Sequence, residues 1–266
     1  MSAASEYAFV TGAASGIGEA IVRELLGSGL TVAGMDLQVE KLAAIASEFP
    51  VQFVPIVADT TKEDDVSRAF LDSQRRLGCL KRAFNVVGGA RVSTLLDHTL
   101  ADWLFTTDLN LTSTFLCIRE EARIMRSAGG AIVNVASLNA HIPAYGASGY
   151  SASKAAVEML TKNAALELAQ YRIRVNAILP GLTVTPSTTR SVLHNASLLA
   201  KYLERIPARR AAAASEIAKP AVFLASDAAS YISGASLVVD GGWSTTTYPD
   251  LSAQYATRSA APRKES

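Results

Sequence analysis

The chain has 266 residues, and 49% of them are hydrophobic, so it is long enough to bury a substantial core. Its 25 Lys and Arg nearly balance its 24 Asp and Glu, which gives no strong field for nucleic acid or an acidic membrane surface. The two cysteines lie far apart and the three histidines are scattered, which argues against a disulfide scaffold or a metal site. No run of about 18 apolar residues occurs and the N-terminus lacks an export pattern, so we expect a cytoplasmic protein with a small-molecule partner, without nucleic-acid or membrane binding.

The N-terminal region has the pattern of a strand, a glycine turn and a helix. Apolar residues 7–10 lead into Thr11-Gly-Ala-Ala-Ser-Gly-Ile-Gly18, after which apolar residues recur at helical spacing. Glycines let the backbone approach a diphosphate, and a helix N-terminus offers unpaired N–H groups to an anion. The residues expected around this anion are Gly12, Ser15, Gly16, Ile17 and Gly18.

Two acidic residues follow the next strands. The strand at 31–35 ends in Asp36, where a carboxylate accepts hydrogen bonds from the ribose hydroxyls of an adenine dinucleotide. The same carboxylate repels a 2′-phosphate, and no Arg or Lys lies within 12–18 or directly after Asp36, so NAD is expected over NADP. After a strand at 53–57 come Asp59 and Thr60, where Asp59 either faces the adenine amino group or forms a helix N-cap turn.

Strands and helices alternate along the rest of the chain. The patterns predict helices at 61–77, 99–109, 111–126, 150–169 and 215–226, and strands at 80–87, 132–135, 173–179 and 237–239. This order predicts an α/β fold, a Rossmann-like, doubly wound parallel sheet with helices on both faces. Its ligand crevice lies beyond the carboxyl ends of the strands.

The region after the Pro180-Gly181 break is the longest irregular segment. Residues 182–210 are expected to form a lid over the substrate, and the apolar stripe on their helical part either lines a pocket or docks on the core. We expect residues 1–266 to form one dinucleotide-binding and catalytic domain with this lid and a C-terminal tail at 244–266. Residues 244–248 could fold over a neighbouring subunit's site, and residues 260–266 are expected to be solvated.

The stretch from 135 to 154 carries the reactive side chains. Ser137 follows a buried strand, and Tyr150 and Lys154 lie about one turn apart on the same face of a helix. A cation beside a phenol favours the phenolate, so Lys154 is expected to lower the pKa of Tyr150. Asn110, at the junction of two predicted helices in an apolar neighbourhood, should be hydrogen-bonded.

Together these residues resemble the short-chain dehydrogenase/reductase family. Thr11-Gly-x3-Gly-Ile-Gly18, Asn110, Ser137, Tyr150-x3-Lys154 and Pro180-Gly181 occur in the family's order and at its spacing, within residues 6–243. The resemblance implies a sheet of about seven strands, and hydride transfer between NAD and an alcohol or carbonyl. It also implies a homotetramer in which helices 111–127 and 150–169 pack across a two-fold axis.

The resemblance assigns a role to each matching residue. Tyr150 would be the general acid/base, Ser137 would orient the substrate oxygen, and Asn110 would anchor a proton-relay water. Lys154 would lower the pKa of Tyr150 and hold the nicotinamide ribose. The remaining cofactor contacts would come from Asn85, Gly88, Pro180, Gly181, Thr183 and Thr185. The chain departs from the family where Val86 replaces a frequent second Asn, which removes an amide that braces the cofactor wall.

The expected substrate is a hydrophobic secondary alcohol or ketone of the cyclic terpene alcohol or steroid type. The pocket is assigned to Ala90, Leu138, Asn139, Tyr145 and Leu182. The surrounding segments are mainly apolar, and Asn139 and His141 are their few polar candidates. That lining disfavours a sugar or a charged acid.

Two alternatives remain open at this point. A 3-oxoacyl thioester reductase would require NADPH and a basic entrance, which Asp36 opposes, and enoyl reductases space Tyr and Lys by six intervening residues. An alternative of another class is a non-catalytic NAD-binding sensor or scaffold. Such proteins typically lack the Tyr or the Lys, and both are present here, so the sequence favours an active enzyme.

Overall fold

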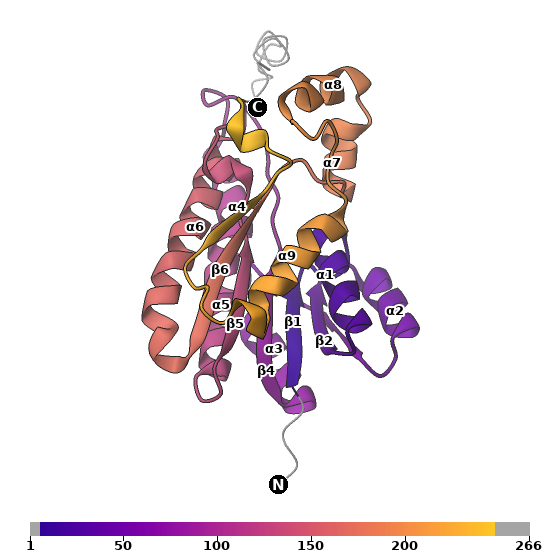
Figure 1. Cartoon of the computed structure of the whole chain (residues 1–266), viewed down its shortest axis with the longest axis vertical. Helices are drawn as coiled ribbons and strands as arrows, with labels where there is room; N and C mark the ends of the chain where they lie inside the picture. The colour runs from indigo at the N-terminus through magenta and orange to yellow at the C-terminus, as the bar shows by residue number, and fades with distance from the viewer. Residues whose placement is uncertain (1–5, 248–266) are drawn as a thin grey trace.

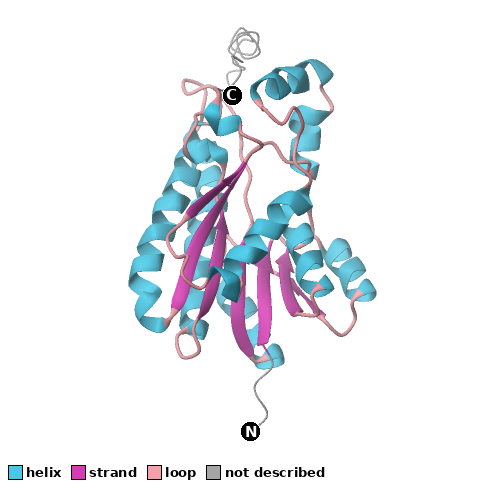
Figure 2. Ribbon diagram, viewed as in Figure 1, coloured by secondary structure: helices cyan, strands magenta, loops and turns pink. Residues whose placement is uncertain are grey.

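A parallel sheet of seven strands forms the centre of the computed structural model, which describes residues 6–247 (Figure 2). The strands are β1 Glu6–Thr11, β2 Thr31–Asp36, β3 Phe53–Val57, β4 Cys79–Asn85, β5 Gly130–Val135, β6 Ile173–Pro180 and β7 Ser236–Val239. Their order is β3-β2-β1-β4-β5-β6-β7, and every neighbouring pair is parallel. The chain therefore reverses its direction across the sheet between β1 and β4, which opens a crevice beyond the carboxyl ends of these strands.

Helices cover both faces of the sheet (Figure 1). One face carries α1 Gly16–Gly27, α2 Val39–Glu48 and α9 Ala214–Ala225, and the other carries α3 Glu63–Leu77, α5 Ser113–Met125 and α6 Ser148–Leu168. Side chains alternate along a strand, so Ala8 and Val10 of β1 pack in the first layer. Tyr7 and Phe9 pack in the second. The predicted doubly wound Rossmann-like fold with seven strands is confirmed.

The region between β4 and α5 differs from the sequence prediction. Strand β4 ends at Asn85 and not at 87, and α4 Leu100–Thr107 continues into α5 through a π-helical turn, Asp108–Thr112. The predicted junction at Asn110 is thus a widened turn inside one continuous helical path. Helix α2 has no counterpart among the predicted elements.

The predicted lid segment contains α7 Pro186–Thr188, a π-helical turn and α8 Ala196–Arg205. Figure 1 shows α7 and α8 beyond one end of the sheet. The first predicted tail residues lie in a 3-10 turn, Trp243–Thr245, whereas 248–266 lie outside the described residues. None of the helices within 6–247 is long and apolar enough to cross a membrane.

A chain of buried polar side chains lies beneath the ends of β4 and β5. Asn85 Nδ2 donates to Glu121 Oε2 at 3.1 Å and to Asn134 Oδ1 at 2.9 Å. Asn134 Nδ2 in turn donates to Thr161 Oγ1 on α6 at 2.9 Å. Glu121 is fully buried, and this burial raises the pKa of its carboxyl to about 8, although the hydrogen bond from Asn85 acts in the opposite direction. Burial therefore favours a protonated Glu121 at neutral pH.

This buried carboxyl predicts a loss of stability as pH rises from 4.5 to about 8. The folded chain holds a proton on Glu121 that the unfolded chain releases near the ordinary glutamate pKa of 4.5. This contribution to the free energy of unfolding therefore falls between pH 4.5 and about 8, by up to ~1.4 kcal/mol per pH unit. Urea unfolding of Glu121→Gln, which carries no titrating proton, should show the variant gaining stability over the parent as pH rises through this window.

The matched control is Glu120→Gln, because the Glu120 carboxylate pairs with Arg123 at 2.6 Å. It should not gain stability over the parent across the same window. A parent protein that keeps pace with Glu121→Gln at every pH would contradict the buried proton.

Candidate active site

The glycine loop folds tightly back on itself between β1 and α1. A Cβ atom on Gly18 would lie 2.0 Å from the carbonyl oxygen of Gly12, so only glycine fits at position 18. Gly12 and Gly16 have φ angles of +66° and +56°, a region that favours glycine. Ser15 is the N-cap residue of α1, and its side chain makes no capping hydrogen bond. Ile17, half-buried, follows in the first turn. The loop thus brings bare backbone and a helix N-terminus to the crevice.

Asp36 lies against this loop at the end of β2. Its Oδ2 accepts a hydrogen bond from the backbone N–H of Ala14 at 3.0 Å, and its Oδ1 accepts one from the backbone N–H of Gln38 at 3.0 Å. Oδ1 also accepts a hydrogen bond from Gln38 Nε2 at 3.3 Å, whereas Oδ2 keeps a second acceptor position. The side chain is therefore fixed beside the glycine loop and still able to accept hydrogen bonds from a ligand.

The side chains of Asp59 and Asn85 both make hydrogen bonds within the protein. Asp59 Oδ1 accepts hydrogen bonds from the backbone N–H and the hydroxyl of Thr61, at 2.9 and 2.7 Å. Asp59 thus forms a local turn before α3. The turn is not itself the helix N-cap, because the N-cap residue of α3 is Lys62. Asn85, a predicted cofactor contact, directs its side-chain Nδ2 into the buried network with Glu121 and Asn134. Thr60, also buried, lines a small internal cavity beside Asn85.

Ser137, Tyr150 and Lys154 meet at the carboxyl end of β5. Lys154 is buried, and its Nζ donates to the carbonyl oxygen of Val135, the last residue of β5, at 2.7 Å. Nζ lies 5.7 Å from the centre of the Tyr150 ring. Ser137, two residues after β5 ends, is hydrogen-bonded to Tyr150. The structure confirms the expected grouping of these three side chains.

The pKa of Tyr150 departs from the sequence prediction. Burial raises the pKa of its phenol, and hydrogen bonding to Ser137 acts in the opposite direction. Burial also lowers the pKa of Lys154 to about 8. Loss of water around both groups disfavours their charged forms. The expected lowering of the Tyr150 pKa by Lys154 is therefore not found in this structure.

Asn110 holds the loop after β4 against the π-helical turn. Its Nδ2 donates to the carbonyl oxygens of Gly89 and Thr106 at 2.6 and 2.7 Å, so the predicted hydrogen bonding of this buried amide is confirmed. A Cβ atom on Gly88 would lie 2.7 Å from Asn110 Oδ1 and 3.0 Å from Lys154 Nζ. Gly88 therefore lies directly beside both side chains.

The end of β6 brings the chain back over the crevice. A Cβ atom on Gly181 would lie 2.8 Å from Asp240 Cα, so the break after Pro180 lies close to the end of β7. Thr183 is buried, with its hydroxyl donating to the Gly181 carbonyl at 3.1 Å. Thr185 caps α7, and its Cγ2 lies 3.1 Å from where a Cβ of Gly16 would be. The start of the predicted lid thus rests on the glycine loop.

The predicted pocket residues divide into buried and exposed groups. Leu138 and Leu182 lie in one apolar cluster with Ile206 and Trp243. Side chains of α7 to α8 and the loop after Leu138 pack against it, namely Ile142, Val192, Leu193, Leu199, Tyr202 and Leu203. Ala90 and Tyr145 are exposed, and Asn139 is half-buried. The apolar side chains of the lid segment therefore pack against the body of the protein and also surround Leu138 and Leu182.

Sequence reasoning did not single out Glu158, yet its carboxylate contacts His141 in the loop after Ser137. The available signal was spacing, because Glu158 follows Lys154 by one helical turn and so shares a face of α6 with it. Within 6–247, no group of three or more His, Cys, Asp or Glu is placed to hold a metal ion.

The close approach of Gly18 to the Gly12 carbonyl can be tested by substitution. In Gly18→Ala, the added methyl group would collide with the Gly12 carbonyl, so we expect the loop to open, with a fall in melting temperature and a loss of NADH binding of at least tenfold. Fluorescence titration with NADH and thermal unfolding measure the two effects. Gly27→Ala, where a Cβ atom meets nothing within 4 Å, should bind NADH like the parent and be equally or more stable. Equal NADH affinity in both variants would refute the close approach.

Comparisons with known proteins agree with this geometry. A family model described as Enoyl-(Acyl carrier protein) reductase matches residues 12–244. The chain is 35% identical to the 3-alpha-(or 20-beta)-hydroxysteroid dehydrogenase of Mycobacterium bovis, covering 89% of this chain and 88% of the relative. It is 37% identical to the galactitol 2-dehydrogenase (L-tagatose-forming) of Cereibacter sphaeroides, covering 89% and 94%.

A solved short-chain type dehydrogenase/reductase from Mycobacterium ulcerans has the same fold. Its TM-score is 0.90 at 30% identity, with coverage of 95% of this chain and 94% of that one. Sequence, family model and structure thus agree over most of the chain. The protein is a member of the short-chain dehydrogenase/reductase family, whose enzymes are oxidoreductases that use a nicotinamide cofactor, NAD or NADP.

Proposed function

We propose that this protein is an NAD-dependent alcohol dehydrogenase and ketone reductase for a hydrophobic secondary alcohol, of the cyclic terpene alcohol or steroid type. One observation carries the proposal. Ser137, Tyr150 and Lys154 converge at the carboxyl end of β5, and Leu138, the neighbour of Ser137, belongs to the apolar cluster beneath the lid.

The catalytic roles follow from the chemistry of these side chains. Tyr150 removes the hydroxyl proton of the alcohol in oxidation and returns it to the carbonyl oxygen in reduction. Ser137 donates a hydrogen bond to the same oxygen as negative charge develops on it. Lys154 holds the nicotinamide ribose and supplies a nearby positive charge, and Asn110 anchors the water that passes the proton to solvent.

The raised pKa of Tyr150 bears on the direction of the reaction. A protonated phenol suits ketone reduction near neutral pH, whereas alcohol oxidation requires the phenolate and is favoured as pH rises.

The cofactor site fits a dinucleotide. The glycine loop leaves no room for a side chain at Gly18, which suits the close approach of a diphosphate to the N-terminus of α1. When bound, the nicotinamide accepts or donates the hydride. Gly12, Ser15, Gly16 and Ile17 would hold the diphosphate, and Thr60 and Gly88 would line the adjoining wall. Pro180, Gly181, Thr183 and Thr185 would enclose the nicotinamide end.

The preference for NAD rests on Asp36. Its carboxylate is fixed at the end of β2 by two backbone N–H groups. A further acceptor contact to the ribose hydroxyls is chemically suited to this group, whereas a 2′-phosphate would meet a negative charge. The same feature opposes a 3-oxoacyl thioester reductase that uses NADPH.

The apolar cluster supports the substrate class. Leu138 and Leu182 are buried among lid side chains that carry no charge, so residues 182–210 are suited to close over an apolar substrate. The hydroxysteroid dehydrogenase relative acts, by its name, on such a molecule, whereas the galactitol relative acts on a polyol. We assign Tyr145, Asn139 and Ala90 to the mouth of the same pocket.

Other readings have less support. Enoyl reduction is opposed by the three intervening residues between Tyr150 and Lys154, despite the name of the family model. A non-catalytic sensor is opposed by the presence of the whole catalytic set.

We also infer a homotetramer in the cytoplasm. Exposed Phe115, Met159 and Leu166 on α5 and α6 support an interface there, and the free Cys79 and Cys117 are consistent with a reducing compartment.

The assignment of Tyr150 is tested by Tyr150→Phe. Formation of NADH from NAD at mildly alkaline pH, followed by near-ultraviolet absorbance across cyclic terpene alcohols, steroids, aryl carbinols, polyols and hydroxy acids, identifies a substrate for the parent. The variant should lose at least about 100-fold in kcat for that substrate, because it lacks the acid/base group. Its affinity for NADH should remain, since the phenol does not hold the diphosphate. Undiminished turnover would show that another group moves the proton.

The cofactor preference is tested by Asp36→Asn, which removes the charge and keeps the shape. The ratio of kcat/KM for NADP to that for NAD should rise by at least tenfold, because the 2′-phosphate no longer meets a carboxylate. Glu40→Gln, which removes an exposed charge at the start of α2, should leave the ratio unchanged. A parent enzyme that already prefers NADP would overturn the argument.

A further inference from the structure

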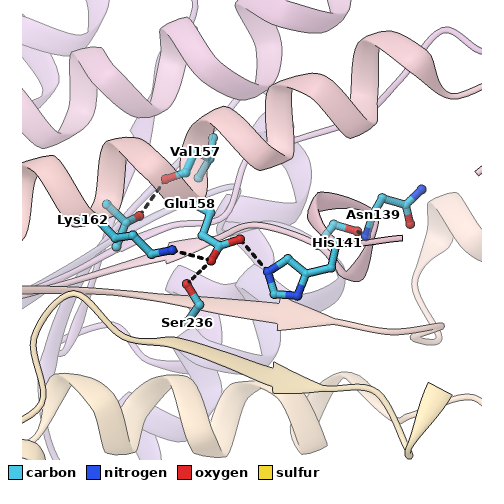
Figure 3. Close-up of polar contacts among 8 residues, drawn as sticks. Asn139, His141, Val157, Glu158, Lys162 and Ser236 are labelled. Atoms are coloured by element: carbon cyan, nitrogen blue, oxygen red, sulfur yellow. Dashed lines mark hydrogen bonds and ion pairs between the residues drawn. The ribbon is translucent and has the colours of Figure 1, made fainter. Parts of the chain in front are cut away.

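The turn that carries Ser137 and the helix that carries Tyr150 are joined a second time, away from the reacting hydroxyls. His141 Nε2 lies 2.7 Å from Glu158 Oε2 on α6 (Figure 3). We propose that His141 and Glu158 are positioning residues that clamp this turn to α6 and keep Ser137 in register with Tyr150 during the reaction. The inference rests on the proposed function, because it assigns a task to groups that serve the same reaction.

The turn transmits a restraint on His141 to Ser137. The backbone N–H of Ala140 donates to the Ser137 carbonyl at 2.9 Å, and the N–H groups of His141 and Ile142 both donate to the Leu138 carbonyl at 3.0 Å. Ser137 Oγ also accepts from the N–H of Asn139 at 3.1 Å. Residues 137–142 thus form one compact hydrogen-bonded unit, so fixing its last part limits the motion of its first.

Glu158 is itself held firmly on α6. Its Oε1 accepts hydrogen bonds from Lys162 Nζ at 3.0 Å and from Ser236 Oγ on β7 at 2.9 Å. Its side chain is 12% exposed. Figure 3 shows Lys162 and Ser236 on one side of the carboxylate and His141 on the other. With Oε1 occupied, Oε2 is directed at the imidazole before any ligand binds.

The charge of Glu158 strengthens this contact. Burial raises the pKa of the carboxyl, but hydrogen bonds from Lys162, Ser236 and His141 outweigh the effect and bring the pKa below its usual value. An ionised carboxylate accepts a stronger hydrogen bond than a neutral group does. The imidazole donates from Nε2 in its neutral or its protonated form.

The spacing along α6 explains why the restraint matters to the site. Tyr150, Lys154 and Glu158 follow one another at intervals of one turn, so they share a face of the helix. In the free protein the hydroxyls of Ser137 and Tyr150 bond to each other. A substrate oxygen that accepts from Ser137 and exchanges a proton with Tyr150 must replace that bond.

One polar contact to α6 then remains on each side of Ser137. Lys154 Nζ binds the Val135 carbonyl before the turn, and Glu158 binds His141 after it. Without the second contact, the turn after Ser137 keeps its apolar packing through Leu138 and Ile142 but loses its hydrogen bond to α6. Small displacements of a group that orients the reacting atoms are costly to the rate.

The test compares His141→Leu, which lacks a donor, with His141→Gln, which keeps a side-chain N–H for Glu158. For a substrate that the parent oxidises, His141→Leu should lower kcat by roughly 10-fold to 100-fold without changing NADH affinity, and His141→Gln should recover most of the loss. Lys219→Met, which removes an exposed lysine on α9 on the opposite face of the sheet from α6, should stay within about twofold of the parent. Equal kcat in parent and His141→Leu, or an equal loss in Leu and Gln variants, would overturn the proposal.

Hydrogen exchange supplies a readout that needs no substrate. Amides of 139–142 should exchange several-fold faster in His141→Leu than in the parent, and in Lys219→Met they should exchange at the parental rate. Unchanged exchange in His141→Leu would refute the clamp. If the parent oxidises none of the alcohols tested, the proposed function fails, and the exchange rates still decide whether His141 restrains the turn.

Discussion

The hydrogen bond between the buried ammonium of Lys154 and the last carbonyl of β5 is the contact around which the site is arranged. An ammonium taken out of water is costly unless it finds a strong acceptor, and its lowered pKa reflects that cost. Because the acceptor belongs to the sheet and the donor to α6, the bond fixes the helix relative to the strand. The position of Tyr150 relative to the end of β5 follows from this contact. On the other side, the absence of a side chain at Gly88 leaves space for Lys154 beside Asn110.

Much of the fold was predictable from local patterns. Seven runs of apolar residues, glycine turns and alternating helices identify a parallel sheet because parallel strands require crossover helices. The catalytic grouping was also predictable, since Ser137 follows a strand end and Tyr150 and Lys154 share a helix face. Helix α2 was missed although its residues have a helical pattern, with Leu42 and Ile45 buried. The π-helical turn was taken as a junction, because its widening is not visible in the spacing of apolar residues. The hydrogen bond from Asn110 to Gly89 is a tertiary contact of the same inaccessible kind.

Side-chain direction and desolvation were the least accessible features. Asn85 was expected at the cofactor, but Glu121, itself an inconspicuous residue on α5, draws its amide into the interior. The pKa of Tyr150 was expected to fall because a cation lies one turn away. Burial acts on the phenol more strongly, and a sequence contains no measure of how much water each group loses. Spacing identifies neighbours, whereas the sign of a pKa shift depends on the whole environment.

The π-helical turn at Asp108–Thr112 has a consequence for how this chain tolerates change. It contains more residues per turn than the α-helices on either side, so it takes up an extra residue while α4 and α5 stay nearly in register along one continuous path. If the same five residues wound as a regular α-helix, α5 would rotate by roughly a quarter turn relative to α4. Glu121 and Cys117 would then leave the interior together, and Asn110 would lose the loop it holds. The widened turn therefore sets which face of α5 is buried.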